Sequence, residues 1–127
     1  MGTWTVDTKQ NPGVLTITME GYFSLTEMES YLNEHNAAVD SFHGLPYRVF
    51  VDIRKLQALS PACSELQEKA KRYSAGKSNF RGSAVLVSAG IIAQQHERTS
   101  LNSGVMSTEI ITVDESEAKR HLASLIR

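Results

Sequence analysis

Three side chains between residues 52 and 63 belong to types that do chemistry. Asp52 follows a buried-looking apolar run, Ser60 precedes Pro61, and Cys63 comes three residues after Ser60. A carboxylate can act as a general base, a serine as a nucleophile or phosphate acceptor, and a thiolate at a helix start as a nucleophile. Each also has a structural interpretation: the carboxylate can bond the next loop or pair with an arginine, the serine can cap a helix, and the cysteine can pack in a core. The local sequence favours the structural interpretation for all three.

A second polar group lies in the segment 91–102, which includes Gln95, His96 and Arg98. The segment has the length of a helix, but polar side chains occupy most of its turns, whereas a helix that covers a sheet normally carries an apolar stripe about 100° wide. The sequence leaves four interpretations open. The helix lines a ligand crevice, contacts a protein partner, forms a homodimer contact, or is short and mostly exposed.

The histidines and the short motifs do not favour a metal or a cofactor. The four histidines lie on different predicted elements without the spacing of metal ligands, and the chain has neither a Gly-rich phosphate loop nor a Gly-x-Ser-x-Gly turn. His35 and His121 fall on the apolar faces of predicted helices, where a packed and hydrogen-bonded imidazole is the usual finding. We therefore predict no metal site and no cofactor.

Charge does not favour nucleic acid. The formal net charge is -1, so the molecule as a whole has no field that attracts a polyanion. A solvated helix end accounts for the local basic residues Lys69, Lys71, Arg72, Lys77 and Arg81. We expect no nucleic-acid partner.

Length and composition are those of one globular domain spanning residues 1–127. The chain is 41% hydrophobic and 21% charged, which suits a packed core, and its single cysteine cannot form an internal disulfide. No apolar run reaches the ~18–20 residues that span a bilayer, and the first ten residues are polar. We expect a cytoplasmic protein without stable membrane insertion.

Apolar patterning predicts five strands. Residues 4–8 and 14–20 alternate in polarity around the turn-forming Asn11-Pro12-Gly13, which predicts a hairpin. Residues 47–53 are nearly continuously apolar, as in a strand buried on both faces of a parallel sheet. Residues 83–89 and 109–113 supply two more strands.

Helix signals predict four helices. Ser24 with Glu27 has the form of a capping box ahead of an apolar pattern that reaches about residue 44, and Ser60-Pro61 opens a second helix that Gly76 ends. The segment 91–102 is the third. Asp114 with Glu117 opens the fourth. The order β-β-α-β-α-β-α-β-α requires an α/β fold with a mostly parallel sheet and one antiparallel N-terminal strand.

This order of elements resembles the SpoIIAA-like (STAS-type) domain of anti-sigma-factor antagonists and sulfate-transporter tails, over essentially the whole chain. The central strand Arg48-Val-Phe-Val-Asp-Ile-Arg54 and the capped helix start Leu59-Ser-Pro-Ala-Cys63 are similar to the family pattern. The C-terminal Ile110-Ile-Thr-Val-Asp-Glu-Ser-Glu-Ala118 is similar to the last strand and helix of bacterial SpoIIAA-like proteins.

The resemblance implies a regulatory role but departs from the family at its switch. Regulatory members are phosphorylated on a serine in an Asp-Ser-Ser-Gly-like segment at the start of the second helix. Ser60 takes the place of the Asp here, and the acceptor position falls on Pro61, which has no hydroxyl. The resemblance therefore implies a regulatory module without the usual phosphoserine switch.

Two functional hypotheses follow. The first is a non-catalytic regulatory or binding module that docks a protein partner or a small ligand, through the loop 54–60 and the start of the third helix. The alternative is a small enzyme or a carrier of a lipid-like molecule that uses a crevice at the strand ends near Asp52, Ser60 and His96. The candidate binding residues are Asp52, Arg54, Ser60, Gln95, His96 and Arg98, and no catalytic residue is assigned.

Overall fold

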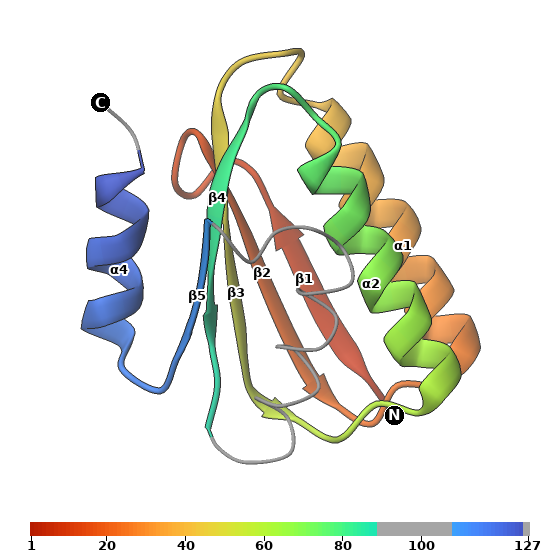
Figure 1. Ribbon diagram of the computed structural model, residues 1–127. Coiled ribbons are helices and arrows are strands. Elements are labelled where there is room, and N and C mark those ends of the chain that lie inside the picture. Colours follow the sequence, from red (N-terminus) through yellow and green to blue (C-terminus); the bar gives the residue numbers. More distant parts are fainter. Residues whose placement is uncertain (89–107, 126–127) are drawn as a thin grey trace.

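The computed structural model describes residues 1–88 and 108–125. In this part of the chain it has five strands and three helices (Figure 1). The elements are β1 Thr3–Asp7, β2 Val14–Gly21, α1 Leu25–Asp40, β3 Tyr47–Leu56, α2 Pro61–Ala75, β4 Phe80–Leu86, β5 Glu109–Thr112 and α4 Glu115–Ser124. The predicted third helix, 91–102, lies outside the described residues.

The five strands form one sheet in the order β1-β2-β3-β4-β5. β1 pairs antiparallel with β2, and every other pair is parallel. The predicted hairpin, the predicted mostly parallel sheet and the central place of β3 are confirmed. Because the parallel strands run the same way, the carboxyl ends of β2, β3, β4 and β5 meet at one end of the sheet.

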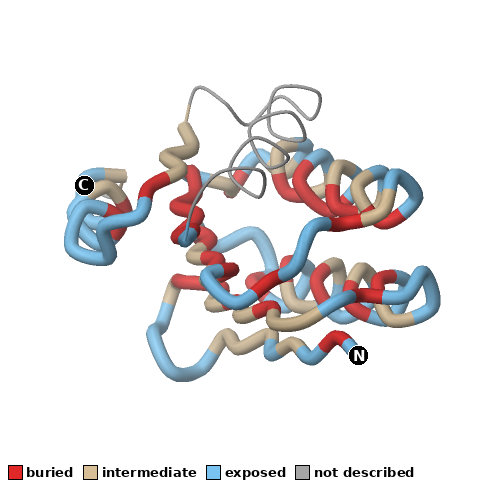
Figure 2. Tube along the Cα trace, turned by 90° about the horizontal axis from the view of Figure 1, so that it is seen from below, coloured by how far each residue is buried: buried red, intermediate tan, exposed pale blue. Residues whose placement is uncertain are grey.

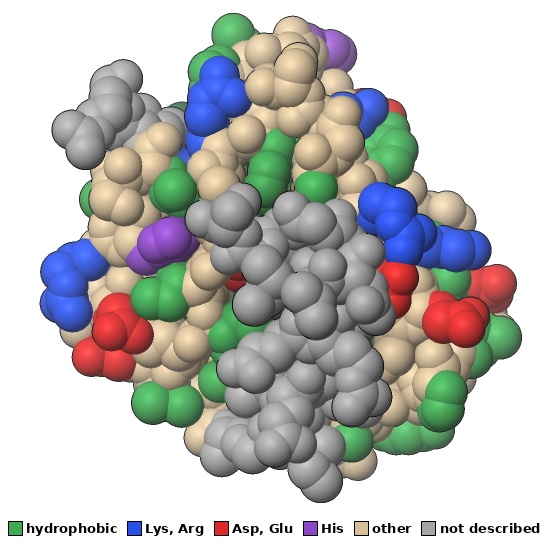
Figure 3. All heavy atoms as spheres, viewed as in Figure 1, with side chains coloured by type: hydrophobic (Ala, Val, Ile, Leu, Met, Phe, Trp, Pro, Cys, Tyr) green, Lys and Arg blue, Asp and Glu red, His purple; other side chains and the backbone are tan. Residues whose placement is uncertain are grey.

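Helices cover both faces of the sheet (Figures 1 and 2). α1 and α2 pack side by side on one face, where the predicted alternation of β2 places Leu15, Ile17 and Met19 in the core. α4 packs on the other face, where Ala118 and Leu122 form a small second cluster. Figure 3 shows charged and histidine side chains on the α4 side of the molecule, with hydrophobic side chains between them.

The central strand is buried from both sides because its alternate residues serve the two helical layers. Val49 and Val51 lie in the core under α1 and α2, whereas Phe50 packs against the cluster under α4. β3 runs three residues beyond the predicted end at Ile53, because Leu56 is buried and pairs with Gly21 beyond a bulge in β2.

Capping residues fix where the helices begin. Ser24 accepts a hydrogen bond from the backbone of Glu27, and the Glu27 carboxylate accepts one from the backbone of Ser24, so the first predicted capping box is complete. Ser60 caps α2 with Pro61 in its first turn. Asp114 caps α4 through the backbone N–H groups of residues 116 and 117. All three predicted helix starts are confirmed.

α1 ends at Asp40, four residues before the predicted end. Residues 41–44 form turns, and His43 and Gly44 adopt positive φ values of 51° and 82°. A helix cannot continue through two left-handed residues. The apolar pattern extends past the helix because Phe42 is still buried, where it stacks on Tyr47 with ring centroids 4.8 Å apart.

Candidate functional site at the carboxyl ends of the strands

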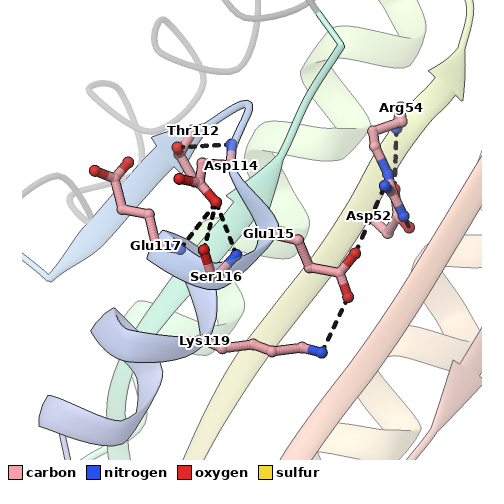
Figure 4. Close-up of polar contacts among 8 residues, drawn as sticks. All are labelled: Asp52, Arg54, Thr112, Asp114, Glu115, Ser116, Glu117 and Lys119. Atoms are coloured by element: carbon pink, nitrogen blue, oxygen red, sulfur yellow. Dashed lines mark hydrogen bonds and ion pairs between the residues drawn. The ribbon is translucent and has the colours of Figure 1, made fainter.

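Asp52 and Arg54 form an ion pair at the end of β3. Side chains alternate along β3, and Val51 and Ile53 point into the core under α1 and α2. Asp52 and Arg54 therefore lie on the opposite face of the sheet. The Asp52 carboxylate accepts hydrogen bonds from Arg54 Nη2 at 2.8 Å, from Arg54 Nε at 3.1 Å and from the Arg54 backbone N–H at 3.1 Å (Figure 4). These bonds from the Arg54 side chain lower the pKa of Asp52, against the opposite effect of its partial burial. Asp52 is therefore an ionised and already occupied carboxylate.

The same arginine connects β3 to the start of α4. Arg54 Nη1 lies 3.6 Å from Glu115 Oε1, and Glu115 Oε2 lies 3.0 Å from Lys119 Nζ one turn along α4. Asp52, Arg54, Glu115 and Lys119 thus form a chain of alternating charges (Figure 4), which we call the charge chain. Its members are partly or largely exposed, so each pair contributes little to stability. Its effect is to orient Arg54 more than to hold the fold.

Asp114 organises the first turn of α4 beside the charge chain. Its Oδ1 accepts hydrogen bonds from the backbone N–H and the hydroxyl of Ser116, at 2.9 and 2.7 Å, and a longer one from the backbone of Glu117. These bonds, led by the Ser116 hydroxyl, lower the pKa of Asp114. The first turn of α4 therefore has a fixed geometry next to Arg54.

The loop after β3 leads directly into α2. Gln57 continues the strand pairing by donating its backbone N–H to Gly21 at 2.9 Å, and Leu59 is buried. The Ser60 hydroxyl accepts the backbone N–H of Cys63 at 3.2 Å. Cys63 is fully buried, and its thiol donates to the carbonyl of Phe23 at 3.5 Å. The structural interpretations of Ser60 as a cap and of Cys63 as a core residue are confirmed.

A shallow groove lies between the ends of β2 and β3, and we call it the strand-end groove. Its lining residues are Thr18, Met19, Glu20, Asp52, Arg54 and Lys55. The bulge in β2 between Thr18 and Glu20 lies beside it, and bulges often occur next to functional sites. Five of its six lining residues are polar or charged, so the groove suits a polar contact. Sequence reasoning missed Glu20 and Lys55, although Lys55 directly follows Arg54.

The structure brings some of the predicted site residues together. Asp52 and Arg54 are bonded to each other, and Ser60 lies at the same end of the sheet, with its hydroxyl engaged as a helix cap. Gln95, His96 and Arg98 lie outside the described residues. Within residues 1–88 and 108–125, no group of three histidine, cysteine or acidic residues is placed to hold a metal ion.

A buried polar cluster between α1, α2 and the sheet was not predicted. His35 Nε2 lies 3.2 Å from Ser74 Oγ and His35 Nδ1 lies 2.9 Å from Asn36 Oδ1, and burial lowers the pKa of His35. Lys71 Nζ lies 3.3 Å from Glu109 Oε1 in an ion pair whose side chains are 9% and 3% exposed. The prediction that Lys71 belongs to a solvated helix end is therefore wrong.

The prediction failed at Lys71 because the buried stripe of α2 was read from its apolar residues alone. Cys63 and Ala70 are buried as predicted, but Gln67, Lys71 and Ser74 are buried as well. Long-range partners on α1 and β5 compensate two of these polar groups, and local sequence does not contain those partners. His35 and His121 follow the prediction, since both make hydrogen bonds, His121 Nε2 at 2.9 Å to the Thr108 carbonyl oxygen.

Comparison with known proteins finds a solved structure with a similar fold. No protein-family model and no curated protein matches the sequence. Among solved structures, the chain is similar to an anti-sigma factor antagonist from Mycobacterium paratuberculosis, with a TM-score of 0.63 and 13% identity over 97% of this chain and 95% of the other. The protein therefore has the SpoIIAA-like (STAS-type) fold, as the sequence predicted. None of the described helices is both long enough and apolar enough to span a membrane.

Proposed function

We propose that the protein is a non-catalytic regulatory module that binds a protein partner at the carboxyl ends of its strands. The observation that carries the proposal is the structural match over nearly the whole chain to a protein whose title names it an anti-sigma factor antagonist. The partner is then a regulatory protein of the type that such antagonists bind. A homodimer and a small ligand at the same surface are the variants of this proposal that the sequence left open.

Arg54, Lys55 and the loop 57–60 supply the described part of the docking surface. Arg54 and Lys55 are exposed, and the charge chain holds the Arg54 guanidinium in one orientation. Prior ordering of a contact residue favours binding, because less side-chain freedom is lost when the partner arrives. Gln95, His96 and Arg98, outside the described residues, are proposed to extend the surface.

The module works without a phosphoserine at the position that the family uses. Pro61 occupies the first turn of α2, where the acceptor serine is expected, and it cannot be phosphorylated. Ser60, its neighbour, uses its hydroxyl to cap the helix. We therefore propose that binding is controlled by partner concentration or by another modification, and not by phosphorylation at Pro61.

The alternative of a small enzyme gains no support from the described residues. A general base at neutral pH usually has its pKa raised toward 7, whereas the pKa of Asp52 is lowered and its oxygens already accept three hydrogen bonds. No hydrogen bond joins Asp52 to Ser60 in the described part of the chain.

Site-specific photo-crosslinking in the host cell tests the docking surface. A photoreactive amino acid is placed at Gln57, in the exposed loop, or at Asn33, on the exposed side of α1. The proposal predicts a discrete crosslinked protein from position 57 and none of the same mass from position 33. Equal crosslinking from both positions, or none from position 57, would contradict it.

A pair of arginine variants then tests the role of Arg54 with the crosslinked partner in purified form. Arg54→Ala removes the guanidinium of the charge chain, and Arg72→Ala removes an exposed arginine that pairs with Glu68 on α2. We expect Arg54→Ala to weaken partner binding by about 10-fold or more, as for an ordered interface arginine, and Arg72→Ala to leave it unchanged. Equal affinities for both variants would remove Arg54 from the surface.

A further inference from the structure

A small, partly open cavity lies between the layer of α1 and α2 and the sheet. Ile17, Val49 and Val51 form its floor, and we call it the core cavity. It has a volume of about 30 Å³. A water molecule needs ~10–15 Å³ by this measure, so the core cavity has room for about two waters or for a molecule of similar size.

One buried polar atom on the wall of the core cavity has no partner. Gln67 is 2% exposed, and its side-chain oxygen Oε1 makes no hydrogen bond in the described part of the chain. Tyr31, on the same wall, is 1% exposed, and burial raises the pKa of its hydroxyl. More than nine in ten buried polar groups in proteins are hydrogen-bonded. An unbonded buried acceptor on the wall of a cavity indicates that an occupant donates a hydrogen bond to it.

The other polar groups on the wall set the charge of that occupant. His35 is already bonded to Ser74, and its lowered pKa keeps the imidazole neutral at pH 7. Lys71 and Glu109 form an ion pair, so their charges compensate each other. A charged molecule entering this space would lose its hydration without gaining a counter-ion from the described residues that line it, which is strongly unfavourable. The occupant is therefore a neutral molecule.

We propose that the core cavity is a binding site for a small neutral amide or alcohol of about three heavy atoms, whose polar group exchanges hydrogen bonds with the Gln67 amide and the Tyr31 hydroxyl. A carboxamide or a hydroxyl both donates and accepts, as these two partners require. Water fills the site when no such molecule is present. This site is separate from the strand-end groove, and its test needs no protein partner.

An NMR titration with formamide and ethanol, and with formate as the charged molecule of the same size, tests the proposal. Ligands of three heavy atoms reach at best about millimolar dissociation constants, so the titration extends to about 200 mM. We expect saturable shifts of the backbone amide signals around Tyr31 and Gln67 with formamide or ethanol, and none with formate. Absence of saturation for both neutral molecules, with only water detected in contact with the Tyr31 ring, would overturn the proposal.

Matched variants show whether the shifts come from this site. Gln67→Met keeps the length of the side chain and removes the amide, and Tyr31→Phe removes one hydroxyl. Each variant should raise the dissociation constant about 10-fold, because it removes one hydrogen bond between uncharged groups at a buried site. Gln10→Met and Tyr22→Phe change the same residue types at exposed positions and should bind as the parent does.

Two buried variants are used so that one can still test the proposal if the other does not fold. If Gln67→Met fails to fold, Tyr31→Phe still decides, because the loss of one hydroxyl leaves the packed ring in place. Unchanged binding in folded Tyr31→Phe, or equal weakening in the two exposed controls, would place the bound molecule elsewhere.

Discussion

The two faces of the sheet are covered by helices that are held in different ways. Under α1 and α2 lies a broad apolar core with large, fully buried side chains such as Tyr31, Met28 and Ile17. Under α4 the buried apolar residues are Ala84, Ala118 and Leu122, with Phe50, Ile110 and Leu125 partly buried around them. The first layer is stabilised mainly by buried area, which scales at about 25 cal/mol per Å².

Polar bonds supplement the small apolar contact of α4. Arg48 Nη1 donates to the Leu122 carbonyl oxygen at 2.8 Å near the end of the helix, and Arg54 reaches Glu115 at its start. Because little apolar area holds it, α4 should open locally at a lower free energy than the α1 and α2 layer. The comparison teaches that one sheet can carry a rigid layer and a more weakly held layer, with the strand-end groove beside the second.

Core truncations on the two faces give the largest expected difference. Ile17→Ala removes a fully buried side chain under α1 and α2 and should lower the free energy of unfolding by about 2–5 kcal/mol. Leu122→Ala, at the α4 face, should cost less, because the smaller cluster collapses more easily around the vacated space. Urea unfolding of both variants measures the difference. Equal losses would mean that the two faces are packed equally tightly.

A glycine in β4 tests how closely α4 approaches the sheet. Gly82 has a φ of 138°, and a Cβ there would lie 2.7 Å from Leu125 Cδ1 and 2.7 Å from the Thr108 carbonyl oxygen. Gly82→Ala should therefore destabilise the protein by about 1–3 kcal/mol and loosen α4, measured by hydrogen exchange of the α4 amides.

Gly13→Ala is the matched control for that prediction. Gly13 also has a positive φ, 78°, but no atom lies within 4 Å of its Cβ position. Gly13→Ala introduces backbone strain but no close contact with a neighbouring residue. It should therefore leave hydrogen exchange of the α4 amides unchanged. If both glycine variants speed exchange in α4 equally, the close contact of Gly82 with the helix is not what holds α4.

The sequence predicted the parts of this fold that depend on neighbouring residues. The alternation of Leu15, Ile17 and Met19 placed β2, and the side chains of Ser24 and Ser60 marked two helix starts, because strand period and cap chemistry are local properties. The order of these elements then allowed few topologies, since parallel strands need crossover connections. That is why the fold was predictable from one sequence.

The candidate site was less predictable because its contacts join distant residues. Asp52 and Arg54 are two residues apart, and a local ion pair between Asp52 and an arginine was foreseen. The pairing of Arg54 with Glu115, and of Lys71 with Glu109, depends on how α4 and β5 dock on the sheet. No periodicity in the sequence records that docking, so Lys71 was placed in solvent and the charge chain was missed.

Low pH should lower the free energy of unfolding, because His35 is buried under α1 and α2 in its neutral form. Burial lowers the pKa of His35 from its ordinary value of 6.5, so the unfolded chain binds a proton more readily than the folded one. The stability supplied by the neutral imidazole is therefore complete above pH 6.5 and is lost as the pH falls from 6.5 toward the lowered pKa. Urea midpoints between pH 8 and 5 measure this loss, and His35→Gln should flatten the profile there. An unchanged profile in the variant would assign the loss to other groups.

The smallest expected effect concerns the tether of α4 to β3. Arg54→Ala removes both ion pairs of Arg54, which is 47% exposed, and should change global stability only slightly, because exposed ion pairs contribute little. Its effect on α4 should be visible as faster hydrogen exchange in the first turn of the helix at low salt, and it should fade at high salt because exposed charges are screened. Arg72→Ala removes a comparable exposed pair on α2 and should leave α4 unchanged. A salt-independent effect of Arg54→Ala would mean that Arg54 holds α4 by packing and not by charge.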